Sequence, residues 1–370
     1  MMMRYMAKTA VCLKVLKNQG EKTIALATKM RLIDKSLIIS RKTDCLLIPL
    51  LHYPTETEIE MLKKETSSKV TLSELDSLII EEGVFEEKVQ PSKTLTQALQ
   101  DQLPKDLLAI LPQAFDIVGD IVIIDIPPLL KVHQGLIGRT ILETHRNIKT
   151  VLAKAGDISG VYRVRDYEFI AGEAKTSTVH REFGWVYHVD VAKAYFSPRL
   201  SHEHERVAAQ VQPGEVVVDL FAGVGPFAVL IGKRQPEARV YAVDLNPDAV
   251  ELLRSNVKVN KVADRVFPVC ADAREIASGE LCGVADRVIM NLPETAIDFV
   301  DAACCAIKPS GGIVHFYGFV RLPDSVDNLV QRFTEAVEHN GKTVKALLQA
   351  RSIRETAPFE SQIVLDVQIQ

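Results

Sequence analysis

A short segment of the chain has the pattern of a strand, a sharp turn and a helix. Val216–Asp219 is an apolar, β-branched run that ends in an acid, and Gly223 and Gly225 follow as the turn. An apolar stretch long enough for a helix begins at Phe227. Because glycine has no Cβ, its backbone can turn tightly and approach a bound group closely. We therefore expect a ligand at this turn.

Three further polar residues follow the later strand-like segments. Asp244 ends YAVD, Asp272 lies in CADAR, and Asn291 begins NLP. An acid at the end of the second strand can accept hydrogen bonds from both hydroxyls of a ribose. Ligands of parallel α/β sheets bind outside the carboxyl ends of the strands, so these side chains are predicted to share one crevice.

The turn distinguishes between two classes of nucleotide ligand. The dinucleotide pattern G-x-G-x-x-G is absent, because Pro226, Phe227 and Ala228 follow Gly225. Proline also removes a backbone N–H near the start of the helix, where a pyrophosphate takes its donors. NAD proteins share the acid at the second strand, but this turn favours a ligand with adenine and ribose and no phosphates. We expect S-adenosylmethionine, with Asp272 facing the exocyclic amine of its adenine.

The elements that position these residues alternate between strand and helix from about Ser201 to the C-terminus. This order predicts a parallel, doubly wound sheet with helices on both faces. The preceding segment, 95–200, mixes helical spacing, a helix around Gly138–Ala155 and alternating hairpin strands, and we interpret it as a separate middle domain. Residues 1–62 resemble a small mixed α/β module, and the acidic segment 63–94 is predicted to be a linker. The domain with this alternating pattern is predicted to span 201–370.

Composition sets the outer limits. The chain has 370 residues, 47% hydrophobic and 25% charged, which is typical of a globular protein with more than one domain. Its six cysteines are scattered without a CxxC pair, so we expect neither a disulfide framework nor a metal site. No apolar run reaches the length of a membrane span. We expect a cytoplasmic monomer without a protein partner.

Charge is distributed unevenly although the net charge is only −4. Residues 1–42 hold ten Lys or Arg against two acids, whereas residues 54–91 hold ten acids against four bases. The simple interpretation is two solvated faces of opposite sign. The alternative is a basic N-terminal module that contacts the phosphates of a nucleic acid. Composition leaves both open.

Taken together, the motifs carry a family resemblance. DLFAGVGPF, YAVDLNP, CADAR and MNLP resemble class I (Rossmann-like) methyltransferases. YRVRDYEF and VDVAKAYFSPRLSHEHERV, followed by MNLP, more specifically resemble the archaeal and eukaryotic tRNA (guanine-37, N1) methyltransferases of the Trm5 family. The resemblance covers about 95–370 and implies a class I sheet with two smaller N-terminal α/β or α+β domains. It also implies tRNA as the partner and substrate, with a middle domain over 95–200 that binds RNA and supports catalysis and a methyltransferase domain over 201–370.

The resemblance implies roles for individual residues. N1 of guanine carries a proton at neutral pH, so methylation needs a general base and a cation or donor at O6. Glu203 corresponds to the base, with Glu205 its nearest competitor, and Arg163 corresponds to the O6 partner because arginine can donate bidentately. Further residues are implied by matching motifs: His204, Phe221, Gly223, Asp244, Leu245, Asp272, Ala273 and Asn291 for the cofactor, Asn291 also for catalysis, and Arg163, Tyr195 and Arg199 for the RNA.

Other chemistries remain as alternatives. Enzymes that methylate exocyclic amines use an Asn/Asp-Pro-Pro-aromatic motif, but here Leu292 and Glu294 replace the first proline and the aromatic residue. No cysteine stands at the end of the fourth strand, so thiol attack on a pyrimidine is disfavoured. Wyosine-pathway enzymes that transfer an aminocarboxypropyl group share the fold but need no base for N1, and Glu203 therefore favours methyl transfer. Methylation of a tricyclic wyosine intermediate, alone or in addition, and a non-catalytic RNA-binding protein also remain open.

Overall fold

The chain folds into two compact units, Met1–Ser92 and Lys93–Gln370. The structure is a computed structural model that describes residues 7–66, 79–86, 94–156, 160 and 162–370. Within those residues, no helix is both long and apolar enough to cross a membrane. Over the same ranges, His, Cys, Asp and Glu side chains form no cluster suited to a metal ion.

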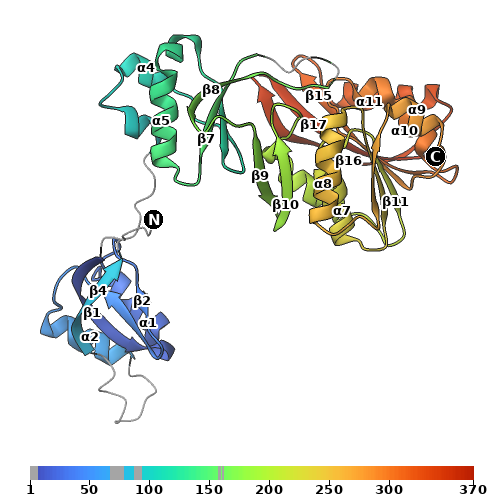
Figure 1. The fold of residues 1–370 in the computed structure, drawn as a ribbon. Coiled ribbons are helices and arrows are strands. Elements are labelled where there is room, and N and C mark those ends of the chain that lie inside the picture. Colours follow the sequence, from blue (N-terminus) through green and yellow to red (C-terminus); the bar gives the residue numbers. More distant parts are fainter. Residues whose placement is uncertain (1–6, 67–78, 87–93, 157–159, 161) are drawn as a thin grey trace. The chain divides into compact units, whose positions relative to one another are not determined.

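The N-terminal unit is a four-stranded antiparallel sheet with the order β2-β3-β1-β4, packed against two helices (Figure 1). Its core is built from alternate residues of the central strand, such as Leu13 and Val15, together with helix residues such as Leu62. The elements are β1 (Ala7–Leu16), α1 (Lys17–Lys29), β2 (Ser40–Arg41), β3 (Cys45–Pro49), α2 (Glu56–Thr66) and β4 (Ile79–Glu86).

The predicted boundary at residue 62, with a linker over 63–94, is wrong where the structure describes that segment. Helix α2 continues to Thr66, and β4 pairs with β1 along nearly its whole length. The acids of β4 point outward or pair across the sheet, as Glu81 does with Lys14 at 3.6 Å, while Phe85 is buried. An acidic strand can thus belong to a core because only one of its faces needs to be apolar. The remainder of the proposed linker, 67–78 and 87–93, lies outside the described residues.

The C-terminal unit begins with a small mixed sheet of order β5-β6-β7-β8, in which only β6 and β7 run parallel. Helix α5 ends at Thr144 and β7 begins at Thr150, so the helix predicted around Gly138–Ala155 is correct only in its first part. The elements are α3 (Leu95–Leu99), α4 (Lys105–Ala109), β5 (Asp116–Val118), β6 (Ile121–Ile124), a 3-10 helix (Pro128–His133), α5 (Gln134–Thr144), β7 (Thr150–Lys154) and β8 (Tyr167–Gly172).

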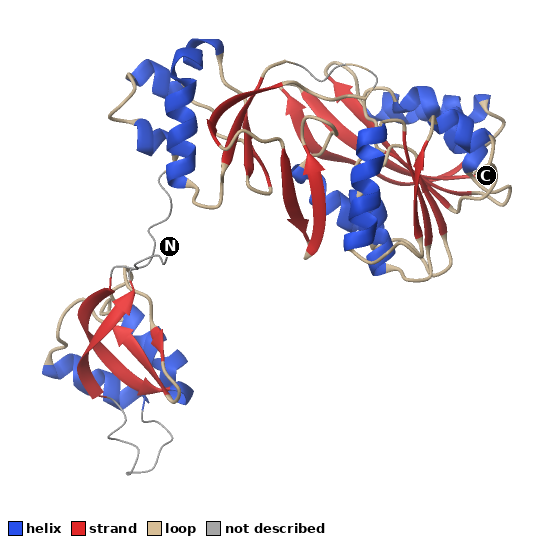
Figure 2. Cartoon of the chain, in the orientation of Figure 1, coloured by secondary structure: helices blue, strands red, loops and turns tan. Residues whose placement is uncertain are grey.

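A seven-stranded sheet of order β13-β12-β11-β14-β15-β17-β16 forms the rest of this unit (Figures 1 and 2). The first five strands in this order are parallel, and β17 and β16 add antiparallel pairs at one edge. This confirms the class I, Rossmann-like sheet. Its strands are β11 (Val216–Asp219), β12 (Arg239–Asp244), β13 (Val266–Cys270), β14 (Arg287–Met290), β15 (Gly312–Arg321), β16 (Val344–Ala357) and β17 (Glu360–Ile369).

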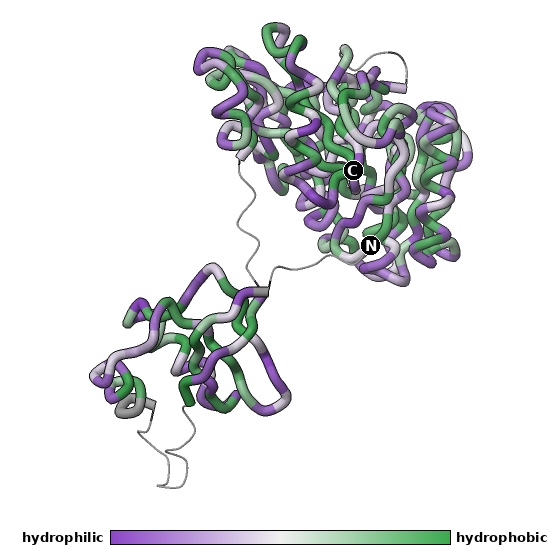
Figure 3. Tube along the Cα trace, turned by 60° about the vertical axis from the view of Figure 1, so that its left-hand side comes forward, coloured by the Kyte–Doolittle hydropathy of each residue, from purple (hydrophilic) through white to green (hydrophobic). Residues whose placement is uncertain are grey.

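Helices cover both faces of this sheet because successive strand residues point to opposite sides. Val217 packs with α6, α7 and α8 on one face, whereas Val218 packs with α9, α10 and α11 on the other. Hydrophobic and hydrophilic stretches alternate along the chain of this unit (Figure 3), as elements with one buried face require. The helices are α6 (Ser201–Ala208), α7 (Pro226–Arg234), α8 (Pro247–Val259), α9 (Ala273–Ser278), α10 (Val300–Ala306) and α11 (Val326–His339).

A hairpin of β9 (Ser177–Glu182) and β10 (Trp185–Asp190) joins the two sheets of the C-terminal unit. Helix α8 holds β10 through two asparagine side chains that act like a neighbouring strand. The amide of Asn256 accepts from His188 N at 2.7 Å and donates to His188 O at 3.1 Å. Asn260 makes the same pair of bonds to Val186, at 3.1 and 2.6 Å. The hairpin is thereby fixed to the helix that follows Asp244.

Candidate functional site

A cavity of about 400 Å³ lies at the carboxyl ends of β11, β12 and β14. The four polar strand ends predicted from the sequence meet here, because the glycine turn, Asp244, Asp272 and Asn291 all line it. Most of the other predicted site residues line the same cavity: Arg163, Tyr195, His204, Phe221, Leu245 and Ala273. Two predicted residues, Glu203 and Arg199, do not line it.

The glycine turn is tied directly to Asp244. Gly223 (φ +55°) donates its backbone N–H to Asp244 Oδ2 at 2.7 Å, and Asn246 N donates to Oδ1 at 2.9 Å. Gly225 (φ +88°) stands before α7, and a Cβ there would lie 2.2 Å from Leu253 Cδ1, so this position requires glycine. Burial raises the pKa of Asp244, although the two backbone N–H groups oppose that shift. Each carboxylate oxygen keeps a lone pair for a ligand hydroxyl.

Two more polar groups face the cavity from neighbouring loops. Asp272 caps α9, with Oδ1 accepting from Arg274 N at 2.8 Å and from Glu275 N at 3.4 Å, so these bonds do not use Oδ2. Asn291 Oδ1 is buried and has no hydrogen-bond partner among the described residues. A buried, unpaired acceptor is costly unless a ligand supplies the donor. Asn291 is therefore the strongest single sign that this cavity holds a polar ligand.

Apolar groups complete the part of the cavity that borders β11 and β12. Phe221 and Phe299 meet edge to face with ring centroids 5.1 Å apart, and Leu245 is 42% exposed at the end of β12. His204 is almost fully buried and is held by Glu182, with Nδ1 2.8 Å from Glu182 Oε2. A flat aromatic ring such as adenine fits between apolar groups of this kind.

Arg163 and Tyr195 line the cavity together with residues that sequence reasoning missed. Arg163 (φ +54°) forms an ion pair with Glu294 at 2.6 Å. Arg354 of β16 also lines the cavity and donates to Ser197 Oγ at 3.2 Å and to Tyr195 Oη at 3.5 Å. Glu294 was noted only as a departure from the amine-methylating motif, and nothing in the sequence near Arg354 marks it.

Arg199 and Glu205 are both engaged away from the cavity. Arg199 Nε donates to Asp116 Oδ1 at 2.5 Å. Glu205 forms an ion pair with Arg234 of α7. Glu205 therefore lies on the α7 side of its helix and is a poor candidate for a base in the cavity.

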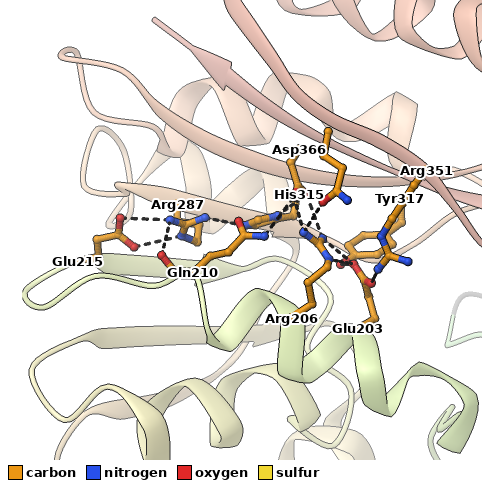
Figure 4. A network of polar contacts seen from close by, with 10 residues as sticks. Glu203, Arg206, Gln210, Glu215, Arg287, His315, Tyr317, Arg351 and Asp366 are labelled. Atoms are coloured by element: carbon orange, nitrogen blue, oxygen red, sulfur yellow. Dashed lines mark hydrogen bonds and ion pairs between the residues drawn. The ribbon is translucent and has the colours of Figure 1, made fainter.

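Glu203 is buried beside the cavity in a network of polar contacts (Figure 4). Oε1 accepts from Arg206 Nη2 at 2.6 Å and from Tyr317 Oη at 2.9 Å, and Oε2 accepts from Arg351. Leu200 and His204, its neighbours on the helix, do line the cavity. Glu203 is thus close to the cavity wall, but its carboxylate points into the network.

Comparisons with known proteins agree with this geometry. Three family models match the chain: a "tRNA methyltransferase 5 N-terminal domain" over residues 12–58, a "TYW2 N-terminal domain" over 95–176, and a "TRM5/TYW2 methyltransferase domain" over 178–345. The tRNA (guanine(37)-N(1))-methyltransferase Trm5b of Pyrococcus abyssi is 44% identical over 267 residues, covering 72% of this chain and 78% of that protein. The tRNA 4-demethylwyosine(37)-methyltransferase Taw21 of Saccharolobus solfataricus is 39% identical, covering 61% of this chain and 82% of that protein.

Solved structures are similar over most of the chain. The complex of aTrm5 with tRNALeu superposes with a TM-score of 0.68 at 30% identity, covering 97% of this chain and all of that one. The Methanocaldococcus jannaschii TYW2 in complex with AdoMet superposes with a TM-score of 0.54 at 28% identity, covering 70% of this chain and 99% of that one.

Proposed function

Because this chain belongs to the TRM5/TYW2 family of tRNA methyltransferases, we propose that it transfers a methyl group from S-adenosylmethionine to N1 of guanosine 37 in tRNA. The relatives support both the substrate and the methyl donor, because they include tRNA methyltransferases, a complex with tRNA and a complex with AdoMet. The observation that carries the proposal is the single cavity in which Asp244, Asp272, Asn291 and Arg163 meet.

The residues of the cavity fit S-adenosylmethionine without phosphate groups. Asp244 offers one lone pair on each oxygen to the two ribose hydroxyls, and Asp272 Oδ2 is suited to the adenine amine. Asn291 Oδ1 needs a donor, which the methionine end or the target base can supply. Phe221 and Leu245 cover the adenine faces, His204 and Ala273 complete the wall, and Gly223 leaves room beside Tyr195. When bound, the cofactor supplies an electrophilic methyl group on a sulfonium.

The reaction requires a proton to leave N1 while the new bond forms. We assign the acceptor of that proton to the Glu203 carboxylate, after which N1 bonds to the methyl carbon and the sulfur–carbon bond breaks. Negative charge that builds on O6 is stabilised by Arg163, whose guanidinium has five donors and gives only part of them to Glu294. We propose that Tyr195, which lines the cavity and is 46% exposed, stacks on the base.

Contacts to the rest of the RNA are proposed from two arginines. Arg199 keeps part of its guanidinium in solvent, with 46% of its side chain exposed beside Asp116. Arg354 lies at the cavity and is bonded to Ser197 and Tyr195. Both side chains can bind phosphate bidentately after modest rearrangement.

Mass spectrometry of digested tRNA tests the proposal. Purified protein is incubated with S-adenosylmethionine and with two tRNA transcripts that differ only in carrying guanosine or adenosine at position 37. We expect 1-methylguanosine in the first transcript and no methylation in the second. Methylation at another position would refute the assignment, and tight cofactor binding without any methylation would favour the non-catalytic alternative. A tRNA that carries the tricyclic wyosine intermediate tests the second methylation activity directly.

A further inference from the structure

The proposed base, Glu203, cannot take a proton in the conformation that the structure shows. Its side chain is 1% exposed, and both carboxylate oxygens accept hydrogen bonds from charged or phenolic donors. A base must lie within hydrogen-bond reach of the proton that it removes. If Glu203 acts on N1, one of these donors has to leave it first.

Sheet register shows how near the carboxylate lies to the cavity. Phe319, Gln362 and Arg354 are paired across β15, β17 and β16 and line the cavity. Tyr317 and Arg351 hold Glu203, and both are paired with Val364. Their row across the sheet lies two residues before Phe319 on β15. Two residues along a strand span about 7 Å. The carboxylate is therefore held one side-chain row behind the cavity lining.

Two of the three donors to Glu203 are fixed. Arg206 uses all five of its N–H groups, on Glu203, Asp366 and Gln349. Tyr317 is fully buried, and burial beside the Glu203 charge raises its pKa well above the usual value, so the hydroxyl stays a donor. Both donors bind Oε1.

A network of further hydrogen bonds holds Arg206 in place from behind. Burial favours a raised pKa for Asp366, but hydrogen bonds from His315 and Arg206 outweigh burial and lower it, so Asp366 is ionised. His315 Nδ1 lies 2.6 Å from Asp366 Oδ1, and its Nε2 lies 2.8 Å from Arg287. Arginine only donates, so His315 is neutral and burial accordingly lowers its pKa. Arg287 is bonded in turn to Glu215 (Figure 4).

Arg351 differs from the other two donors. It binds Oε2, it lies on β16 at the edge of the seven-stranded sheet, and 36% of its side chain is exposed. A β-bulge between Ser352 and Arg354 adjusts the pairing of β16 next to it. A long, partly exposed arginine can exchange one anion for another at small cost, because both ends of the movement satisfy its donors.

We propose that Arg351 is a latch that holds Glu203 in the free enzyme and moves to an RNA phosphate when tRNA binds, which releases Oε2 toward the cavity. This inference rests on the proposed role of Glu203 as the base. Arg351 is a positioning residue, since it acts on the reacting base only through Glu203. Withdrawal of Arg351 frees Oε2, whereas Oε1 keeps its hydrogen bonds from Arg206 and Tyr317.

The pH dependence of methylation separates the free enzyme from the complex. The rate at limiting tRNA reports groups of the free enzyme, and the rate at saturating tRNA reports groups of the complex. If the proposal is right, Arg351→Gln removes a cation from beside Glu203 in the free enzyme. In the complex with tRNA it changes nothing beside Glu203, because Arg351 has already moved away. Loss of a neighbouring cation makes a carboxylate easier to protonate by about 1 to 3 pH units. We therefore expect the acid limb to move to higher pH at limiting tRNA and to keep its position at saturating tRNA.

The experiment uses the full chain and whole tRNA transcript, and it measures initial rates of methyl transfer between pH 5 and pH 9. This range is wide enough to follow a shift of about 1 to 3 pH units. Arg351→Lys, which keeps the charge, should move the limb less. Arg332→Gln is the matched control, because Arg332 is a half-exposed arginine of α11 paired with Asp324. Calorimetric binding of S-adenosylmethionine checks that each variant is folded.

Each outcome decides the proposal. A shift only at limiting tRNA, with weaker tRNA binding, supports the latch. Equal shifts in both regimes mean that Arg351 stays on Glu203 during the reaction, and no shift in either means that it does not influence the base; both results overturn the latch. Glu203→Gln is measured in parallel: if that variant methylates at the parental rate, it is the assignment of the base that has failed.

Discussion

At the scale of single residues, three acids close to the cavity differ because their surroundings differ. Asp244 accepts only backbone N–H groups and keeps lone pairs for a ligand. Glu203 is neutralised by guanidinium groups. Asp219, at the end of β11, is fully buried and Oδ2 has no partner among the described residues. The different roles that we propose for Asp244 and Glu203 rest on these different surroundings and not on the carboxyl group alone.

The general base is tested with Glu203→Gln. The amide removes the proton acceptor and keeps the side-chain volume, so methylation is expected to fall by about a hundred- to ten-thousand-fold, the usual contribution of a positioned base. Cofactor affinity, measured by calorimetry, should not change. Glu205→Gln, two residues along the same helix and paired with Arg234, is the control and should stay close to the parental rate. The reverse ranking of the two variants would move the base to Glu205.

The ribose contact is tested with Asp244→Asn. One charge and one acceptor oxygen are removed, so binding of S-adenosylmethionine should weaken by roughly 1.5–3 kcal/mol, the contribution of hydrogen bonds to a charged group. Isothermal titration calorimetry measures the difference. Asp248→Asn, on the first turn of α8 and paired with exposed Lys193, is the matched control. Unchanged affinity in the Asp244 variant would mean that the ribose lies elsewhere.

Asp219 makes stability depend on pH. Burial, opposed by the Phe221 N–H and reinforced by the Asp244 charge, raises the pKa of Asp219 to about 7. In the unfolded chain the pKa of an aspartate is about 4. Between the two pKa values the folded state binds one more proton than the unfolded state, so stability falls as pH rises. Urea midpoints of the parent should decline from pH 5 to pH 8 more steeply than those of Asp219→Asn. Identical slopes would show that the carboxyl is not protonated in the folded state.

The residues that line the cavity at the ends of the strands could be predicted from the sequence. The residues that contact Tyr195 and Arg163 could not. Strand-end acids such as Asp272 follow from the fold rule that polar groups gather at one edge of a parallel sheet. Arg354 and Glu294 could not be found, because their contacts with Tyr195 and Arg163 join segments far apart in the chain. Burial of a motif residue such as Glu203 in a network is likewise set by tertiary packing.

At the scale of elements, the sequence predicted the repeating strands and helices of the methyltransferase sheet better than the smaller domains. Segments such as β11 are continuous apolar runs bounded by turn residues, which define a buried parallel strand. Strand β4 was missed because it contains several acids and only one of its faces is buried, so its sequence resembles a polar linker. Strand β7 was merged with α5 because the apolar spacing continues through the short loop between them.

The attachment of the β9–β10 hairpin to α8 is testable at one residue. Asn256→Ala removes two bonds to the partly buried backbone of His188 and a third, buried bond to Val224 O at 2.9 Å, so these groups lose a partner. Each unsatisfied buried group costs about 1–3 kcal/mol, so thermal unfolding should occur at clearly lower temperature. Lys258→Ala, an exposed change on the same helix, is the control. Equal melting temperatures would mean that the hairpin does not depend on this contact.

At the scale of the whole molecule, the N-terminal unit is not basic once its true extent is used. The unit runs to Ser92, so the basic and acidic stretches are parts of one domain. Residues 1–92 contain 14 Lys and Arg against 13 Asp and Glu. Contact with RNA phosphates therefore has to come from the placement of the cations on the surface and not from net charge.

Deletion of residues 1–92 tests whether this unit binds tRNA away from the anticodon. The boundary follows the compact unit, since a cut after residue 62 would leave β4 without its partner β1. All residues lining the cavity lie in the second unit, so cofactor affinity should not change. Affinity for whole tRNA should fall, and its dependence on salt should become shallower by roughly 0.7–0.9 in log–log slope for each phosphate that the shortened protein no longer neutralises.

An anticodon stem-loop provides the comparison that makes the deletion decisive. If the N-terminal unit contacts only distant parts of tRNA, methylation of the stem-loop is indifferent to the deletion, whereas methylation of limiting whole tRNA slows. Equal losses on both substrates would instead show that the unit supports the catalytic unit structurally. A truncated protein that aggregates would point the same way, because it would reveal an apolar surface that the N-terminal unit covers.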